Sequence, residues 1–373
     1  MSYLIGGILG IAAVIKKNNK LLFALLFAYA FIVFAFNVSN PDLLNYSMNY
    51  IGKYRILEPI YNALVVLFNY AGVSFWVFRG FIAFIGLVLV SDIIIRYSPY
   101  PNLVFFLYLL YPFVIDIVQF RSFISLAIMI FSVRFIIDYH LTEHKLNIIY
   151  FLTCLILATG IHYAAVFYSI LLLLFLDVRK NKFLFCFIIP VCVVVATVFV
   201  PRLAGILFEL LGEGKTATWI SAHADISLFM IFRITLMRVS PFLLIVIAEH
   251  TKKSDHYLLD KNLNKRVDID NGNINFYLIL SSYYMVLYSV MELAIATDYE
   301  RLSRFSLVIC TIALSRVVYK LEKHNKHIYT GLFIIYYIIF FFTNMYANWT
   351  GRFLYIEGVF RRVMENNLIF GVQ

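Results

Sequence analysis

The sequence has few charged residues for its length, and this shortage excludes an ordinary soluble domain. Only 14% of its 373 residues are charged, whereas 62% are hydrophobic. A soluble domain of this size carries roughly a quarter charged residues. One soluble core cannot bury so much apolar surface, so lipid is expected to cover a large part of it.

Nucleotide-binding and hydrolase motifs are missing as well. The chain contains no Walker A sequence, GxSxG elbow, HExxH motif or dinucleotide-binding glycine fingerprint. An ATP-driven pump and a soluble-type hydrolase are therefore disfavoured. Any reaction must then draw its energy from the substrate itself.

Cysteine is scarce, and its placement does not indicate a metal site. The chain has 4 cysteines, all within apolar runs, without CxxC spacing or neighbouring histidines. We interpret them as small buried hydrophobic residues. No cofactor or bound metal is predicted, although a requirement for a divalent cation stays open.

Apolar blocks close to bilayer length recur along the whole chain and predict an all-α, polytopic transmembrane bundle. We expect about 12 spans, within a range of about 10 to 14, because several blocks are shorter than a straight crossing requires. No internal repeat or linker divides the chain, so residues 1–373 are expected to form a single integral membrane domain. The blocks lie at 2–15, 21–36, 74–95, 102–115, 121–137, 147–159, 162–176, 183–200, 228–249, 274–295, 301–319 and 328–347.

The net charge of +10 is explained by membrane orientation and not by nucleic-acid binding. Most lysines lie in alternate connectors, which is the pattern of cytoplasmic loops. Both termini are then predicted to face outward. The predicted inner connectors are 16–20, 96–101, 138–146, 177–182, 250–273 and 320–327.

Two connectors are long enough for a separate structural prediction. Residues 250–273 are predicted to form a polar cytoplasmic loop, whereas 37–73 is expected to be a structured outer-face segment with short helices. In the latter, Asp42, Tyr46 and Tyr50 share one helical face. Pro59 suits the first turn of a second short helix.

Polar residues interrupt the apolar run at 111–128, near the predicted outer end of two spans. Asp116, Gln119 and Arg121 are expensive at membrane depth and therefore call for a partner or a cavity. Asp116 and Arg121 either form a structural ion pair at a turn, or Arg121 lines a cavity and meets an anion. The sequence leaves both interpretations open.

Further arginines lie at predicted outer ends. Arg301 and Arg304 are neighbours on one helical face, where they either pair with Asp298 and Glu300 or bind phosphate through their forked guanidinium groups. Arg233 is a weaker candidate, since a snorkelling arginine explains it equally well.

A small break at 160–163 places His162 at another outer boundary. It is either a hydrogen-bonded residue of a helix hairpin or a proton donor or acceptor in group transfer.

Four short segments, in order, give the chain a family resemblance. They are NPDLLNYSMNY with LEPIY (40–61), YPFVIDIVQFRSFISLAI (111–128), LATGIHYAAVFY (157–168) and ERLSRFSL (300–307). This series resembles the EpsG-like family of Wzy-type polysaccharide polymerases over roughly residues 1–320. The chain departs from many relatives at Phe36-Asn37 and Asn40-Pro41, which carry neither the basic residue nor the Gly-Thr/Ser-Asp sequence found there.

The resemblance implies a fold like that of C-type membrane glycosyltransferases and a location in the bacterial inner (cytoplasmic) membrane. It implies that oligosaccharide repeat units on polyprenyl diphosphate are polymerised at the outer face, with release of polyprenyl diphosphate. A chain-length regulator and a flippase of the same pathway are the implied protein partners.

Roles for individual residues follow as expectations of this chemistry. The diphosphate ligands are Arg121, Arg301, Arg304 and, more weakly, Arg233, because arginines stabilise a departing diphosphate. The base is one of Asp42, Glu58 and His162, which the sequence does not rank. Sugar contacts are assigned to Tyr46, Tyr50, Tyr61 and Gln119.

Other functions remain open at this stage. A flippase for the same lipid-linked sugar, an O-antigen ligase-like enzyme and an acyltransferase would need similar cationic residues. A non-catalytic scaffold is less expected because expensive charges gather on one predicted side. The sugar, its linkage, the stereochemical course and the oligomeric state are not encoded in any motif.

Overall fold

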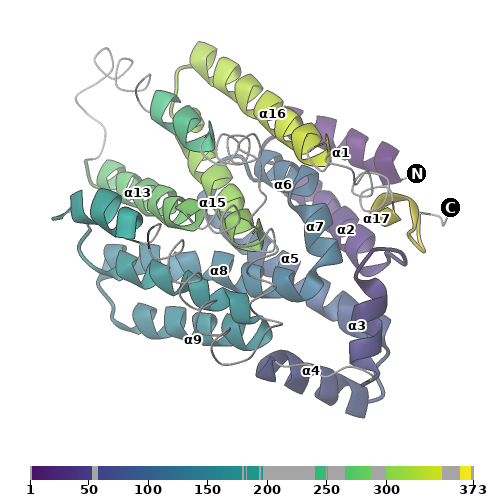
Figure 1. The fold of residues 1–373 in the computed structure, drawn as a ribbon. Coiled ribbons are helices and arrows are strands. Elements are labelled where there is room, and N and C mark those ends of the chain that lie inside the picture. Colours follow the sequence, from purple (N-terminus) through teal and green to yellow (C-terminus); the bar gives the residue numbers. More distant parts are fainter. Residues whose placement is uncertain are drawn as a thin grey trace.

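A computed structural model shows a bundle of helices, which confirms the all-α prediction for the part of the chain it describes (Figure 1). That part comprises residues 2–52, 58–178, 180–181, 183–192, 195, 240–248, 250, 265–287, 300–346 and 362–370. Within these ranges the only β-type pairing is an isolated bridge between Asn37 and Asn367.

The helices follow the predicted apolar blocks. Residues 240–248 are also helical, and α13 includes the last part of the polar 250–273 segment. The named elements are α1 (Ser2–Ile15), α2 (Lys20–Ala35), α3 (Leu43–Tyr50), α4 (Pro59–Tyr70), α5 (Phe75–Tyr97), α6 (Pro101–Leu110), α7 (Phe113–Val118), α8 (Phe120–Thr142), α9 (Leu146–Ile161), η1 (Tyr163–Phe175), η2 (Leu184–Ile188), α13 (Lys265–Leu287), α15 (Glu300–Tyr319), α16 (Lys323–Tyr346) and α17 (Arg362–Glu365).

Local sequence signals set several helix starts. The Asn19 side chain accepts a hydrogen bond from the Leu22 amide and caps α2, and Ser74 caps α5 in the same way. Pro59 and Pro101 occupy the first turns of α4 and α6, where a missing N–H costs nothing. The predicted helix start at Pro59 is confirmed.

Three helical stretches in the described residues are long and apolar enough to cross a membrane. They are α5, α8 and the Leu302–Tyr319 part of α15. The other apolar helices, α1, α2, α6, α9 and η1, are shorter. The count of about 12 spans therefore stays a prediction.

The predicted 102–115 block is not one continuous helix. Tyr111 is extended, with φ −163° and ψ 132°, and separates α6 from α7. The following Pro112 explains the break, because a residue before proline is disfavoured in the helical region. A second break at Gln119 separates α7 from α8. Asp116 and Arg121, which lie on either side of the second break, are therefore carried by two different helices.

Helix α8 lies at the centre of the described bundle and packs against α5, α9, α13 and α15 (Figure 1). Gly86 of α5 permits one of these contacts. A Cβ there would lie 2.3 Å from the Phe123 ring of α8. The buried faces of these helices form the apolar core.

Two buried or partly buried arginines mark opposite ends of the bundle. At one end, Arg79 near the start of α5 donates to the Asn37 carbonyl just beyond α2. At the other end, Arg316 of α15 donates to the Tyr97 carbonyl at 2.9 Å. The first end contains the connectors predicted to face outward, although the assignment to a membrane side stays a prediction.

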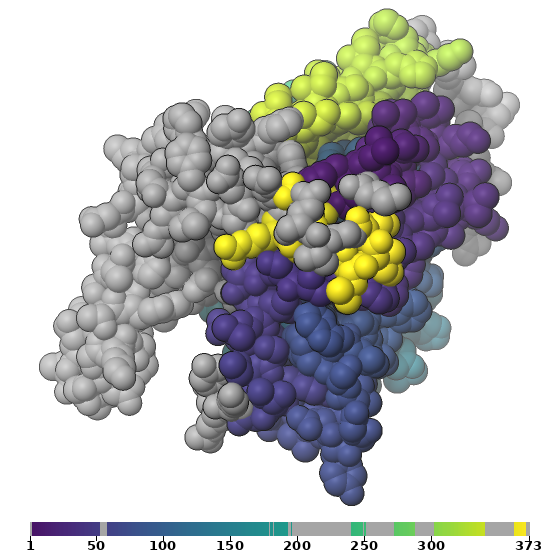
Figure 2. Space-filling view, turned by 90° about the vertical axis from the view of Figure 1, so that its right-hand side faces the viewer, coloured from purple at the N-terminus to yellow at the C-terminus, as the bar shows by residue number. Residues whose placement is uncertain are grey.

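The described C-terminal residues lie against the N-terminal helices at the predicted outer end (Figure 2). The Asn37 amide donates to the carbonyls of Val363 and Asn366, each at 3.1 Å. The Ser2 hydroxyl donates to the Met364 carbonyl. Residues 362–370, here called the C-terminal strap, thus join α1 to the segment after α2.

Candidate functional site

Three of the predicted site residues form one cluster at the predicted outer end. The Glu58 carboxylate lies 3.1 Å from Arg121 Nη1 through one oxygen and 3.5 Å from His162 Nδ1 through the other. Their side chains are 9%, 23% and 13% exposed in that order. A carboxylate, a guanidinium and an imidazole are therefore fixed together while retaining partial access. We call this the Glu58 cluster.

The backbone explains how the three residues meet. Glu58 is the extended residue before α4, Arg121 lies in the first turn of α8, and His162 is the extended residue between α9 and η1. A Cβ on Gly160 would lie only 2.4 Å from Ile60 Cδ1. The absence of a side chain at Gly160 therefore lets α4 approach the end of α9 and brings Glu58 to His162.

The cluster keeps Glu58 charged at neutral pH. Burial by itself would raise the pKa of the Glu58 carboxyl, but the contact with His162 and the positive charge of Arg121 outweigh it, so the pKa lies below its ordinary value. The position before α4 adds a favourable helix dipole. Glu58 is consequently a carboxylate that accepts a hydrogen bond from Arg121 and faces His162, which makes it a weak base.

A second polar network lies deeper, around Arg304 of α15. Arg304 Nη1 lies 2.6 Å from Asp116 Oδ1, and Nη2 donates to Gln119 Oε1 at 2.9 Å. Nη2 also lies 3.4 Å from the Ser122 hydroxyl, and Tyr108 donates to the other Asp116 oxygen at 3.0 Å. Both members of the ion pair are fully buried.

These contacts decide between the two interpretations of Asp116. Asp116 pairs with Arg304, so the suggested Asp116–Arg121 pair is wrong, and Arg121 pairs with Glu58 instead. The break at Gln119 is the reason, because it directs α7 and α8 differently and leaves Asp116 and Arg121 facing different neighbours. The buried Arg304 is neutralised by Asp116 of α7.

The predicted sugar-binding residues occupy different environments. Tyr50 and Tyr61 are 4% and 1% exposed and pack on Phe78, so their rings belong to the core of this conformation. Tyr46 is partly exposed, with its ring centroid 4.2 Å from that of Phe120. The Tyr61 ring also lies beneath Arg121, 5.7 Å from the guanidinium carbon.

The remaining predicted residues are less fully described. Asp42 precedes α3 and is partly exposed. Arg301 belongs to α15, but its side chain lies outside the described residues, as does all of Arg233. In the described part, no group of three or more His, Cys, Asp or Glu side chains is arranged to hold a metal ion.

Sequence reasoning missed a fully buried arginine, Arg79. Its guanidinium donates to the Asn37 carbonyl and lies 3.5 Å from the Asn37 side-chain oxygen. The signal was present, because Arg79 is a charged residue inside the apolar run FWVFRGFIAF. Arg79 fixes Asn37, which in turn bonds to the C-terminal strap.

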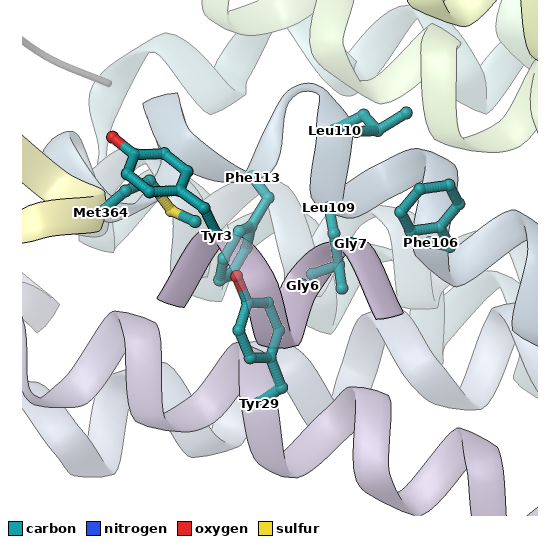
Figure 3. A pocket seen from close by; sticks show the side chains of 9 residues that line it. All are labelled: Tyr3, Gly6, Gly7, Tyr29, Phe106, Leu109, Leu110, Phe113 and Met364. Atoms are coloured by element: carbon teal, nitrogen blue, oxygen red, sulfur yellow. The ribbon is translucent and has the colours of Figure 1, made fainter. Parts of the chain in front are cut away.

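An apolar cavity of about 270 Å³ lies at the same end, between α1, α2, α6, α7 and the C-terminal strap (Figure 3). Gly7 borders open space, whereas Gly6 makes room for the Tyr29 ring. None of its nine lining residues is charged. This cavity is therefore unsuited to a diphosphate or a sugar, in contrast to the Glu58 cluster.

Comparisons with known proteins identify one relationship. No curated protein and no solved structure gives a significant match to this chain. The EpsG family matches residues 20–356. This match spans the Glu58 cluster, the Arg304 network and the three long apolar helices. The chain belongs to the EpsG family.

Proposed function

We propose that this protein polymerises oligosaccharide repeat units carried on polyprenyl diphosphate at the outer face of a bacterial cytoplasmic membrane. Membership of the EpsG family supports a role in polysaccharide biosynthesis. The single observation that carries the reaction is the Glu58 cluster, which holds a cation and an imidazole on one carboxylate. These are the groups that glycosyl transfer from a diphosphate requires.

In this reaction an acceptor hydroxyl attacks the anomeric carbon of the donor glycan. The new glycosidic C–O bond forms as the bond to the diphosphate oxygen breaks, and polyprenyl diphosphate departs with the bonding electron pair. The hydroxyl proton must pass to a base. Because the energy is stored in the donor, no nucleotide is consumed.

His162 is the base that the geometry favours among Asp42, Glu58 and His162. Its Nδ1 lies 3.5 Å from the Glu58 carboxylate, and a carboxylate beside one ring nitrogen orients an imidazole so that the other nitrogen can accept a proton. Glu58 then acts as the orienting group. The lowered pKa of Glu58 makes it a weak base, so it fits this role better than that of the proton acceptor.

Arg121 is the favoured ligand for the departing diphosphate. It is partly exposed, unlike the fully buried Arg304, and therefore reaches a ligand without unfolding the core. Arg304 is better placed to position Gln119 and Asp116 through its hydrogen bonds. Arg301 and Arg233 complete the set of diphosphate candidates, and Tyr46 is the tyrosine most available to a sugar.

The reaction is tested with the purified chain in lipid nanodiscs, a polyprenyl-diphosphate-linked repeat unit from the source organism and no nucleotide sugar. Products spaced by whole repeat units, together with released polyprenyl diphosphate, are expected. Transport of the unit across a vesicle membrane without elongation would instead support a flippase. Transfer to a lipid core would support a ligase.

Matched variants test the assigned roles. His162→Gln is expected to lower elongation about 10²- to 10⁴-fold, the usual range for losing a general base. Arg121→Ala is expected to lower it about 10²-fold or more through loss of charge stabilisation. His144→Gln and Arg96→Ala alter the same residue types at the opposite end of the bundle and should leave elongation unchanged. Equal losses in the controls would contradict these roles.

A further inference from the structure

Two lysines distant in sequence lie over a pair of touching tyrosine rings at the end of the bundle opposite the Glu58 cluster. Lys17 Nζ lies 4.9 Å from the centroid of the Tyr100 ring, and Lys326 Nζ lies 4.9 Å from that of Tyr319. The two rings contact each other edge to face, with centroids 5.6 Å apart. We call these four residues the lysine–tyrosine cluster.

The backbone around Lys17 is fixed and not a freely moving loop. The fully buried Asn102 donates its backbone amide to the Lys17 carbonyl at 3.1 Å and its side-chain amide to the Lys16 carbonyl at 2.6 Å. Lys17 Nζ also donates to Thr330 Oγ1 of α16 at 3.3 Å. Lys17 is therefore held beside α16, the helix that carries Lys326.

Within the part of the chain that the structure describes, the positive charge at this cluster has no acidic partner. In the described residues no carboxylate lies within 4 Å of Lys17 or Lys326, and the pKa of Lys17 is lowered by burial and by the charge of Lys326. Two arginines at this end differ, since Arg96 and Arg134 each lie 3.7 Å from Asp92. Two like charges held together without a counter-charge are costly unless an anion joins them.

Exposed apolar side chains flank the same place. Ile15 and Leu21, on either side of the lysine connector, are 73% and 71% exposed, and Ile328 of α16 is 46% exposed. These side chains indicate that lipid hydrocarbon reaches the lysine connector. A lipid provides a phosphate for the lysines and hydrocarbon for the neighbouring apolar side chains.

We propose that the lysine–tyrosine cluster binds the phosphate of an anionic phospholipid in the inner leaflet of the membrane. The phosphate bridges the two ammonium groups, and the acyl chains lie along the exposed apolar side chains. The proposal rests on the membrane placement given above, in which 16–20, 96–101 and 320–327 face the cytoplasm. It does not depend on the polymerase reaction.

The test compares lipid binding to the intact chain in a neutral detergent, using phosphatidylglycerol and phosphatidylcholine with identical acyl chains. Native mass spectrometry counts bound lipids, and thermal unfolding reports the stabilisation. The variant is Lys17→Gln with Lys326→Gln. Its matched control is Lys20→Gln with Lys145→Gln, which removes the same charge from two exposed lysines of the predicted inner connectors.

The wild-type chain is expected to retain one phosphatidylglycerol that phosphatidylcholine does not replace. The lysine-pair variant should bind it about 30-fold more weakly, since each lysine near an anionic lipid surface contributes about fivefold. The matched control should keep the lipid. Lys17→Arg with Lys326→Arg retains both charges and should also keep it, which separates loss of charge from loss of folding.

Three results would overturn the proposal. Equal weakening in the matched control would indicate diffuse attraction of the whole basic face. Unchanged binding in the lysine-pair variant would place the lipid elsewhere. Equal stabilisation by millimolar inorganic phosphate in the absence of lipid would identify a site for a free anion.

Discussion

Arg304 and Asp116 form a fully buried ion pair with 2.6 Å between Nη1 and Oδ1, although 188 residues separate them in the chain. Tyr108 donates a hydrogen bond to Asp116, and Arg304 donates one to Gln119. The pair therefore joins α6, α7 and α15 beside the first turn of α8. Because isolated buried charges are costly, each partner depends on the other.

Removing one member of this pair is expected to destabilise the fold more than replacing both members together. Arg304→Gln or Asp116→Asn alone leaves an uncompensated buried charge and should cost about 3–5 kcal/mol. The double variant should lose clearly less than the sum of the two. Thermal unfolding in detergent checks this, with Arg96→Gln as an exposed control. Additive losses would show that the two side chains do not interact in solution.

Gly160 is expected to be required for the approach of α4 to α9. In Gly160→Ala the new Cβ would lie 2.4 Å from Ile60 Cδ1 and 3.1 Å from Ile60 Cβ, so α4 must move. We expect a loss of about 1–3 kcal/mol in stability and a larger loss of elongation than of folding, because Glu58 moves with α4.

Two further variants make this test specific. Ile60→Ala should restore much of the loss in the Gly160→Ala background by removing the clashing atoms. Gly331→Ala is the matched control, since its Cβ meets nothing within 4 Å. A Gly160→Ala protein as stable and active as wild type would contradict the close approach of the two helices.

The lowered pKa of Glu58 predicts a pH-dependent contribution to stability. A carboxyl whose folded pKa lies below its unfolded value stabilises the fold above the unfolded pKa, and this effect fades as pH falls through the folded pKa. The ordinary value is 4.5, so Glu58→Gln should unfold at a lower temperature than wild type at pH 7 and approach it below pH 4.5.

Thermal unfolding between pH 7 and pH 3.5 measures this difference. Glu322→Gln, at an exposed position, should follow wild type throughout. A gap between Glu58→Gln and wild type that stays constant or widens as pH falls would mean that Glu58 is not held charged by Arg121 and His162.

Asn37 is expected to keep the C-terminal strap in place. Asn37→Ala removes amide hydrogen bonds to Val363 and Asn366 and should cost about 1–3 kcal/mol by leaving buried carbonyls unpaired. Amide exchange should then quicken at Leu368, whose N–H donates to the Phe36 carbonyl at 3.0 Å. Exposed Asn45→Ala should leave that exchange unchanged, and protection of Leu368 in both variants would contradict this role.

The recurring apolar blocks made the helices predictable from the sequence. They did not predict which residues the charged side chains contact. Pro59 indicated the start of α4 because its ring fits a first helical turn. By contrast, the spacing of Asp116 and Arg121 suggested a local pair, and their actual partners are Arg304 and Glu58. Local spacing does not reveal contacts made across a bundle.

The sequence by itself determined that this chain is helical and suited to a membrane, because apolar blocks and scarce charge leave lipid as the remaining solvent for so much apolar surface. It also indicated that Glu58, Arg121, His162 and Arg304 are polar residues that require a partner or a function in a membrane protein. Only the tertiary structure decided which of them meet. Helix breaks at Pro112 and Gln119 and the close approach at Gly160 set directions that side-chain chemistry alone does not encode.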